Sequence, residues 1–113
     1  MGHTDSYDFH QICPVDDLPS GERILFEIEG FSIALFRVGE KYYAISDVCT
    51  HDNGPIGDGE LDGLEVVCPR HGARFDLETG NATRLPAVRG IPVYPVRVRE
   101  NLIEVGIPIR IAR

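Results

Sequence analysis

The stretch CTHDNGPIGDGELDGLEVVCPRHGARFD, residues 49–76, carries two of the three cysteines and two of the four histidines in this chain of 113 residues. They form two pairs: Cys49 and His51 make a Cys-x-His motif, and Cys68 and His71 make a Cys-x-x-His motif. Each pair follows an apolar run and enters a segment with Gly or Pro, which predicts a loop at the end of a short strand. Two loops with the same ligand types indicate one metal centre shared between them.

Two kinds of metal centre are compatible with these four side chains. Thiolate and imidazole ligands suit zinc and iron, and four of them complete either a tetrahedral zinc site or a binuclear iron–sulfur cluster. A zinc knuckle usually repeats one ligand type, whereas each loop here supplies one thiol and one imidazole. With two irons, each loop can give its cysteine to one metal and its histidine to the other, and a Gly-rich backbone can bring N–H donors close to the sulfides. The mixed motif therefore favours the cluster, with structural zinc as the alternative.

Short apolar runs on both sides of this stretch predict β-strands. The segment RILFEIEGFSIALFRVGEKYYAIS has three runs rich in Ile, Val, Phe and Tyr, separated at Glu29-Gly30 and Gly39-Glu40, which is typical of antiparallel strands joined by tight turns. No segment predicts a helix of three turns, so the expected fold class is all-β, a small antiparallel sandwich or barrel-like arrangement. Strands are predicted at residues 23–28, 31–38, 41–46, 64–68, 73–76, 93–99 and 102–105.

The composition is that of one small globular domain. Apolar residues make up 42% of the chain, which is enough for a single core. The net charge of −7 disfavours nucleic acid as a partner, and no apolar run approaches the roughly 20 residues that cross a membrane. An odd cysteine count without an apolar leader predicts a cytoplasmic protein. Residues 1–8 are polar and predict a flexible N-terminus before a domain at residues 9–113.

Charge is distributed unevenly along the chain. Residues 1–61 carry twelve acidic and three basic side chains, and residues 62–113 carry six acidic and eight basic ones. Either the acidic excess only keeps the protein soluble, or it orients a protein partner. Charged side chains near the two motifs are expected to be solvated and are candidates for that orientation: Asp52, Asp58, Glu60, Arg70 and Arg74.

The paired motifs resemble those of the Rieske iron–sulfur family. The sequence C-T-H at residues 49–51, sixteen intervening residues and C-P-R-H-G at residues 68–72 look like its two-loop motif. FDLETG at residues 75–80 and LPA at residues 85–87 extend the likeness, which covers roughly residues 9–106. The resemblance implies a Rieske-like sandwich with two cluster-binding loops.

The same resemblance implies a ligand set and a cofactor. Cys49 and Cys68 would hold the inner iron of a [2Fe-2S] cluster, and His51 and His71 would hold the outer iron near the surface. The chain is most similar to the small ferredoxins of ring-hydroxylating oxygenases. It is therefore expected to be a one-electron carrier that passes electrons from a reductase to an oxygenase or a similar acceptor.

Four positions depart from the pattern of the respiratory and photosynthetic members. Those members carry two further cysteines that join the loops by a disulfide, at positions that correspond here to Gly54 and Arg70. They also use a serine and a tyrosine hydroxyl to hydrogen-bond the cluster sulfurs, and the matching residues here are Ala73 and Phe75. Hydrogen bonds to sulfur stabilise the reduced cluster, so their loss predicts a low reduction potential.

Two further functions remain open from the sequence. The chain could be the small subunit of a nitrite-reductase-like complex, which shares the fold, or a structural zinc-binding interaction module. It contains no nucleophile with a partnered base, no phosphate loop and no mononuclear iron triad, so the expectation is an electron-transfer component rather than an enzyme.

The remaining candidate side chains have structural interpretations. Cys13 lies in a strand-like segment and is expected to be a small buried hydrophobe. His3 and His10 have no spaced partner and are expected to be ordinary surface or strand residues. Tyr42 and Tyr43 are expected to pack in a strand rather than to carry electrons.

Overall fold

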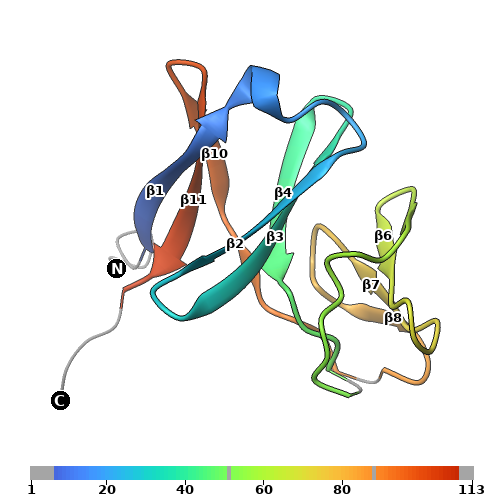
Figure 1. The fold of residues 1–113 in the computed structure, drawn as a ribbon. Helices are drawn as coiled ribbons and strands as arrows, with labels where there is room; N and C mark the ends of the chain where they lie inside the picture. The colour runs from blue at the N-terminus through green and yellow to red at the C-terminus, as the bar shows by residue number, and fades with distance from the viewer. Residues whose placement is uncertain (1–6, 51, 88, 110–113) are drawn as a thin grey trace, which may run out of the picture.

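The computed structural model describes residues 7–50, 52–87 and 89–109. In this part of the chain nearly all regular structure is β-strand, with one three-residue 3-10 helix, η2, at Val15–Asp17. Figure 1 shows these elements. The strands are β1 (Tyr7–Pro14), β2 (Arg23–Ile28), β3 (Phe31–Val38), β4 (Lys41–Ser46), β5 (Leu61–Asp62), β6 (Glu65–Val67), β7 (Arg74–Asp76), β8 (Ala82–Arg84), β9 (Val93–Tyr94), β10 (Val96–Arg99) and β11 (Leu102–Pro108).

The strands form three antiparallel sheets. Their orders are β1-β11-β10 in the first sheet, β2-β3-β4-β9 in the second and β5-β6-β7-β8 in the third. The third sheet is an insertion, because the chain leaves the second sheet after β4 and returns to its neighbour β9. In Figure 1 the third sheet projects to one side of the other two.

Strand β3 is the centre of the molecule because both of its faces are covered. Ile33 and Leu35 pack in one core with residues of β11, and Ala34 and Phe36 pack in a second core with residues of the third sheet. All four side chains are fully buried. A strand covered on both sides has a continuous apolar sequence rather than an alternating one, which explains the run Ile-Ala-Leu-Phe.

The hairpin turns occur at the predicted positions. Glu29 and Gly30 between β2 and β3 have φ of 52° and 84°, and Glu100 and Asn101 between β10 and β11 have φ of 53° and 67°. Two successive positive φ values are those of a type I′ turn, whose twist matches that of the paired strands.

The strand predictions at residues 23–28, 31–38 and 41–46 are confirmed to the residue. The strand expected at residues 93–99 is interrupted at Pro95, where the chain passes from the second sheet to the first. Proline has no N–H for a strand ladder and therefore suits such a crossing. The last strand continues to Pro108, where it pairs with Tyr7 of β1, so β1 begins two residues before the expected domain start.

Strands β5 and β8 were not expected from the sequence. Each has only two or three residues, and each is held by a neighbour in the third sheet rather than by an apolar pattern of its own. No described helix is long and apolar enough to cross a membrane.

Candidate metal centre

The two predicted ligand loops lie at the same end of the third sheet (Figure 1). The first loop, residues 47–60, connects β4 to β5, and the second loop, residues 68–73, connects β6 to β7. Cys49 is 0% exposed and Cys68 is 1% exposed. Both thiols therefore face the interior, although both loops lie at the surface.

Backbone hydrogen bonds fold each loop around its cysteine. In the first loop the Cys49 N–H donates to the Gly54 carbonyl at 2.7 Å, and the Asn53 N–H donates to the Cys49 carbonyl at 2.6 Å. In the second loop the Cys68 N–H donates to the Ala73 carbonyl at 2.7 Å, and the Gly72 N–H returns to the Cys68 carbonyl at 3.0 Å. The two turns present their cysteines toward the space between the loops.

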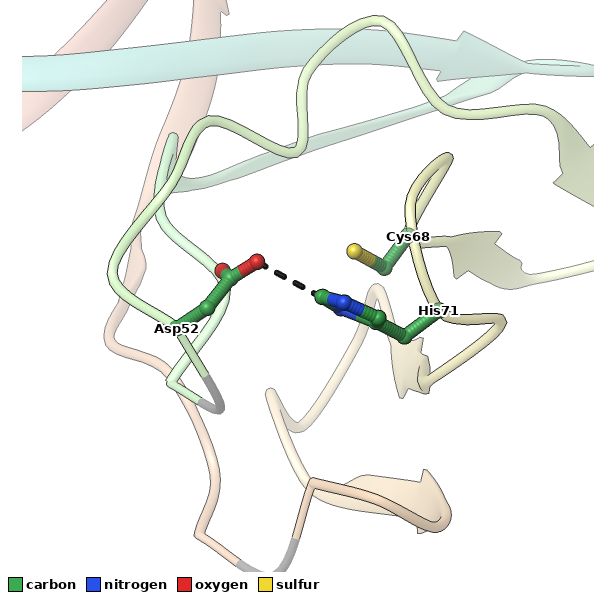
Figure 2. Close-up of side chains that lie close together, drawn as sticks. All are labelled: Asp52, Cys68 and His71. Carbon is green, nitrogen blue, oxygen red and sulfur yellow. Dashed lines mark ion pairs between the residues drawn. The ribbon is translucent and has the colours of Figure 1, made fainter.

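The structure brings three of the four predicted ligands to this space. Cys49 lies within hydrogen-bonding reach of Cys68, and the His71 ring lies beside Cys68 (Figure 2). Asp52 of the first loop points toward His71, with its Oδ2 atom 3.4 Å from His71 Nδ1. His51, the fourth predicted ligand, lies outside the described residues.

The surroundings of Cys68 favour a thiolate. Burial raises the pKa of the Cys68 thiol, but hydrogen bonds from the backbone N–H groups of Arg70 and His71 and from the Cys49 side chain lower it more. The net pKa therefore lies below that of an ordinary thiol. A thiolate is the form of cysteine that binds metal.

Two side chains that the sequence analysis did not single out hold the first loop in place. Asp47 Oδ1 accepts hydrogen bonds from the backbone N–H groups of Ile56 at 2.8 Å and Gly57 at 2.6 Å. Arg23 of β2 donates to the Gly57 carbonyl at 2.6 Å and also to the carbonyl of Gly59. The position of Asp47 directly after an apolar strand was the one signal in the sequence. Nothing near Arg23 in the sequence pointed to a loop 34 residues away.

A second arginine, Arg70, joins the two loops by an ion pair. Arg70 donates from Nε to Asp52 Oδ2 at 2.6 Å and from Nη2 to Asp52 Oδ1 at 2.9 Å. These bonds to Arg70, together with the Gly54 N–H, hold the pKa of the Asp52 carboxyl well below its usual range. Asp52 and Arg70 are both exposed, as expected, and in addition each has the other as its partner. Arg74 is likewise paired, with Asp62 at 2.7 Å.

The other candidates lie away from this centre. Cys13 in β1 is only partly buried, and it packs on the core between the first and second sheets. His10 lies in the same strand, 3.6 Å from Asp8 and 3.7 Å from Glu29. Tyr42 and Tyr43 are partly buried against the two cores, as expected for strand packing. His3 is outside the described residues.

The donor set fits a [2Fe-2S] cluster. Two buried thiols from two loops face one another, backbone N–H groups point at one of the sulfurs, and the His71 side chain next to them is 46% exposed. Buried sulfur ligands and a surface imidazole suit an iron pair with one interior and one outer metal. Ala73 and Phe75, both 0% exposed, place no hydroxyl group beside the thiols.

An all-β domain that holds such a donor set at one end, between two loops, is a small iron–sulfur protein of the electron-transfer class. The Rieske [2Fe-2S] domain family matches residues 8–95. The chain belongs to this family, so its cofactor is a [2Fe-2S] cluster and the structural zinc alternative is set aside.

Known proteins support the same class. The chain is 43% identical over 97 residues to the 3-phenylpropionate/cinnamic acid dioxygenase ferredoxin subunit of Escherichia coli (strain K12), covering 85% of this chain and 91% of the relative. It matches, with 30% identity and a TM-score of 0.84, a chain in the solved complex of reduced oxygenase and oxidized ferredoxin in carbazole 1,9a-dioxygenase, covering 92% and 97% of the two chains.

A third match concerns the alternative function. The putative NADH-dependent nitrite reductase small subunit of Mycobacterium tuberculosis is 27% identical with a TM-score of 0.79, and the match covers 95% of this chain and 98% of that chain. The fold is thus shared between ferredoxins and such subunits. The protein is an electron-transfer component rather than a catalytic enzyme.

Proposed function

We propose that Cys49, His51, Cys68 and His71 hold the cluster, and that the chain carries single electrons from a reductase to the oxygenase component of a ring-hydroxylating dioxygenase. The observation that carries this proposal is the meeting of Cys49, Cys68 and His71 between two loops of a Rieske fold. When bound, the cluster supplies a site that accepts and releases one electron.

The residues of the chain divide the work of such a carrier. The buried thiols and the N–H groups around Cys68 exclude water from the sulfur side of the site and stabilise negative charge there. The His71 side chain is 46% exposed and offers an approach to the site from the surface. No substrate needs to enter the molecule.

The support for an oxygenase as acceptor comes from two relatives. One is a dioxygenase ferredoxin subunit at 43% identity, and the other was solved with an oxygenase. A cytoplasmic location, where a flavin reductase and its nicotinamide donor are available, belongs to the same proposal.

The direct test is reconstitution. The purified protein, with its iron and sulfide content measured first, is mixed with a ferredoxin reductase and the oxygenase of a ring-hydroxylating system, and electron transfer to the oxygenase is followed by stopped-flow absorbance. Reduction by the reductase followed by reoxidation by the oxygenase supports the proposal. A protein that holds a full cluster but exchanges no electrons with any such oxygenase would overturn it.

The likeness to a nitrite reductase small subunit supplies a second candidate. That function requires stable association with a large catalytic subunit. Co-purification with a nitrite reductase large subunit, together with failure to reduce any oxygenase, would favour it. We rank it second because the identity to the dioxygenase ferredoxin is higher, 43% against 27%.

A further inference from the structure

We propose that Asp52, Arg70 and Gly54 form a non-covalent latch that holds the two ligand loops together and sets how long the protein retains its cluster. Asp52 and Gly54 belong to the first loop and Arg70 to the second, so the contact crosses the space that the ligands share. The three are positioning residues, because they act on the cluster through the loops and, for Asp52, also through its contact with His71. The inference rests on the proposed function in one respect: both loops must carry ligands of the cluster.

The guanidinium of Arg70 is bonded on three of its nitrogen atoms. Nε and Nη2 donate to the two oxygens of Asp52 at 2.6 and 2.9 Å, and Nη1 donates to the Pro55 carbonyl at 2.7 Å. A planar fork that bonds both oxygens of one carboxylate is geometrically specific as well as strong. Arg70 is thereby fixed to two separate points of the first loop.

Asp52 is fixed within its own loop as well. Its Oδ1 accepts from the Gly54 N–H at 3.0 Å, in addition to its bond from Arg70. The Asp52 side chain is 25% exposed and the Arg70 side chain is 33% exposed. An ion pair whose carboxylate is already held costs less side-chain entropy to form than one between two free surface chains.

Gly54 leaves the space that the Arg70 guanidinium occupies in the latch. A Cβ atom at this position would lie 2.7 Å from Arg70 Nη2 and 2.8 Å from Arg70 Cζ. The guanidinium therefore rests directly on the Gly54 backbone, and any larger residue must displace it. Gly54 has no positive φ in the structure, so the close approach of Arg70 is the reason for glycine here.

An ion-paired arginine within the third sheet gives a natural comparison. Arg74 pairs with Asp62 at 2.7 Å and with Glu65 at 3.2 Å. Those three residues lie on strands β7, β5 and β6, and their pairing joins strands rather than ligand loops. Substitution at Asp62 thus removes the same kind of charge from the same sheet without touching the latch.

The experiment measures cluster loss in the intact protein. Wild type and the variants R70Q, R70K, D52N, G54A, G54A/R70Q and D62N are isolated with their clusters. The visible absorbance is then followed in the presence of an iron chelator at low and high ionic strength, and circular dichroism melting reports global stability. R70Q and D52N should lose the cluster roughly three- to tenfold faster than wild type. The loss rate of R70K should lie between those of wild type and R70Q, because lysine keeps the positive charge but cannot bond both carboxylate oxygens as the guanidinium does.

Two results separate a latch from a general effect on stability. G54A should resemble R70Q when made alone and add no further loss in the R70Q background, because its Cβ acts only by displacing Arg70. High salt should accelerate loss in wild type but not in R70Q. A variant that is folded by circular dichroism but retains no cluster at all also supports the latch.

The inference fails under three outcomes. These are loss rates equal to wild type in both R70Q and D52N, full additivity of G54A with R70Q, and an equal effect of D62N. Wild-type protein without iron and sulfide would instead overturn the proposed function, so the two failures are distinguishable.

Discussion

The three cysteines show how surroundings decide the role of one residue type. Cys49 and Cys68 are buried at the turn of a loop, each with backbone hydrogen bonds around it, whereas Cys13 lies in a regular strand. For Cys13, burial and the nearby Asp17 carboxylate raise the thiol pKa. A raised pKa leaves the thiol protonated and disfavours metal binding.

The first prediction tests the ligand set. Cys49→Ala and His71→Ser should each abolish the visible absorbance of the cluster, because a Rieske cluster uses two cysteine and two histidine ligands and each variant removes one of them. Iron and sulfide analysis of the purified variants is the measurement. Cys13→Ala is the matched control and should keep a full cluster, and a stable, complete cluster in either ligand variant would contradict the assignment.

The second prediction concerns the reduction potential. Rieske potentials span about −150 to +300 mV, and this chain lacks side-chain hydroxyls at Ala73 and Phe75, so we expect a value on the order of −100 mV. Ala73→Ser and Phe75→Tyr should each raise it by roughly 50 mV, since a hydrogen bond to sulfur stabilises the reduced state by about 1 kcal/mol.

Protein-film voltammetry from pH 6 to 9 provides the measurement for this second prediction. A wild-type potential well above zero would contradict the view that the missing hydroxyl groups lower the potential. Unchanged potentials in both hydroxyl variants would do the same.

At the scale of elements, the first loop is held by hydrogen bonds to the residue that follows β4. Asp47 follows β4 directly, and its carboxylate accepts the N–H groups of Ile56 and Gly57, which are both buried. Without this acceptor the two donors would be left unpaired in the interior.

The third prediction follows from that support. Asp47→Ala should lower the free energy of unfolding by about 1–3 kcal/mol and speed cluster loss, because buried donors without a partner are costly. Asp47→Asn keeps an acceptor oxygen and should recover most of the loss. Chemical denaturation of wild type and both variants checks this. An Asp47→Ala variant as stable as wild type would show that the loop does not depend on the carboxylate oxygen.

The sequence predicted the regular strands and the ligand motifs but not the supports between distant segments. The hairpins of β2, β3 and β4 are local, so apolar runs and turn residues specify them. The contacts of Arg23 with Gly57 and Gly59, and of Arg70 with Asp52, join residues that no local pattern relates. The short strands β5 and β8 were missed for the same reason, since their pairing partners rather than their own residues define them.

At the scale of the whole molecule, exposed acidic residues lie at both ends. Asp58 and Glu60 are exposed and line a surface hollow that reaches Cys68, so they lie at the cluster end. Asp16 in η2 and Glu100 in the β10–β11 turn are exposed. In Figure 1 the β10–β11 turn lies at the end of the molecule away from the third sheet. Asp52 is also exposed, but its charge is paired with that of Arg70, so it is left out of the charge test below.

The fourth prediction concerns association with the reductase. Asp58→Asn with Glu60→Gln should slow reduction at low ionic strength and weaken its salt dependence, because exposed charges near the contact mainly steer the encounter. The control Asp16→Asn with Glu100→Gln removes the same charge from the far end and should leave the rate close to wild type. The measurement is the rate of reduction in stopped flow at several ionic strengths. If the rate depends on ionic strength equally in the two double variants, Asp58 and Glu60 have no role in docking and serve only solubility.

The insertion of the third sheet has a consequence for how such carriers diversify. Ala44 and Ile45 of β4 pair directly with Tyr94 and Val93 of β9, so residues 47–92 leave and re-enter the scaffold at adjacent strands. Residues 47–92 are therefore one contiguous coding segment, here called the cassette, whose two ends lie side by side in the fold. Recombination that exchanges the cassette between relatives would transfer the redox properties and the partner-facing surface together, without rethreading the remaining chain. Such an exchange requires that the incoming cassette again cover Ala34, Phe36 and Ile45. It must also again accept the hydrogen bonds from Arg23.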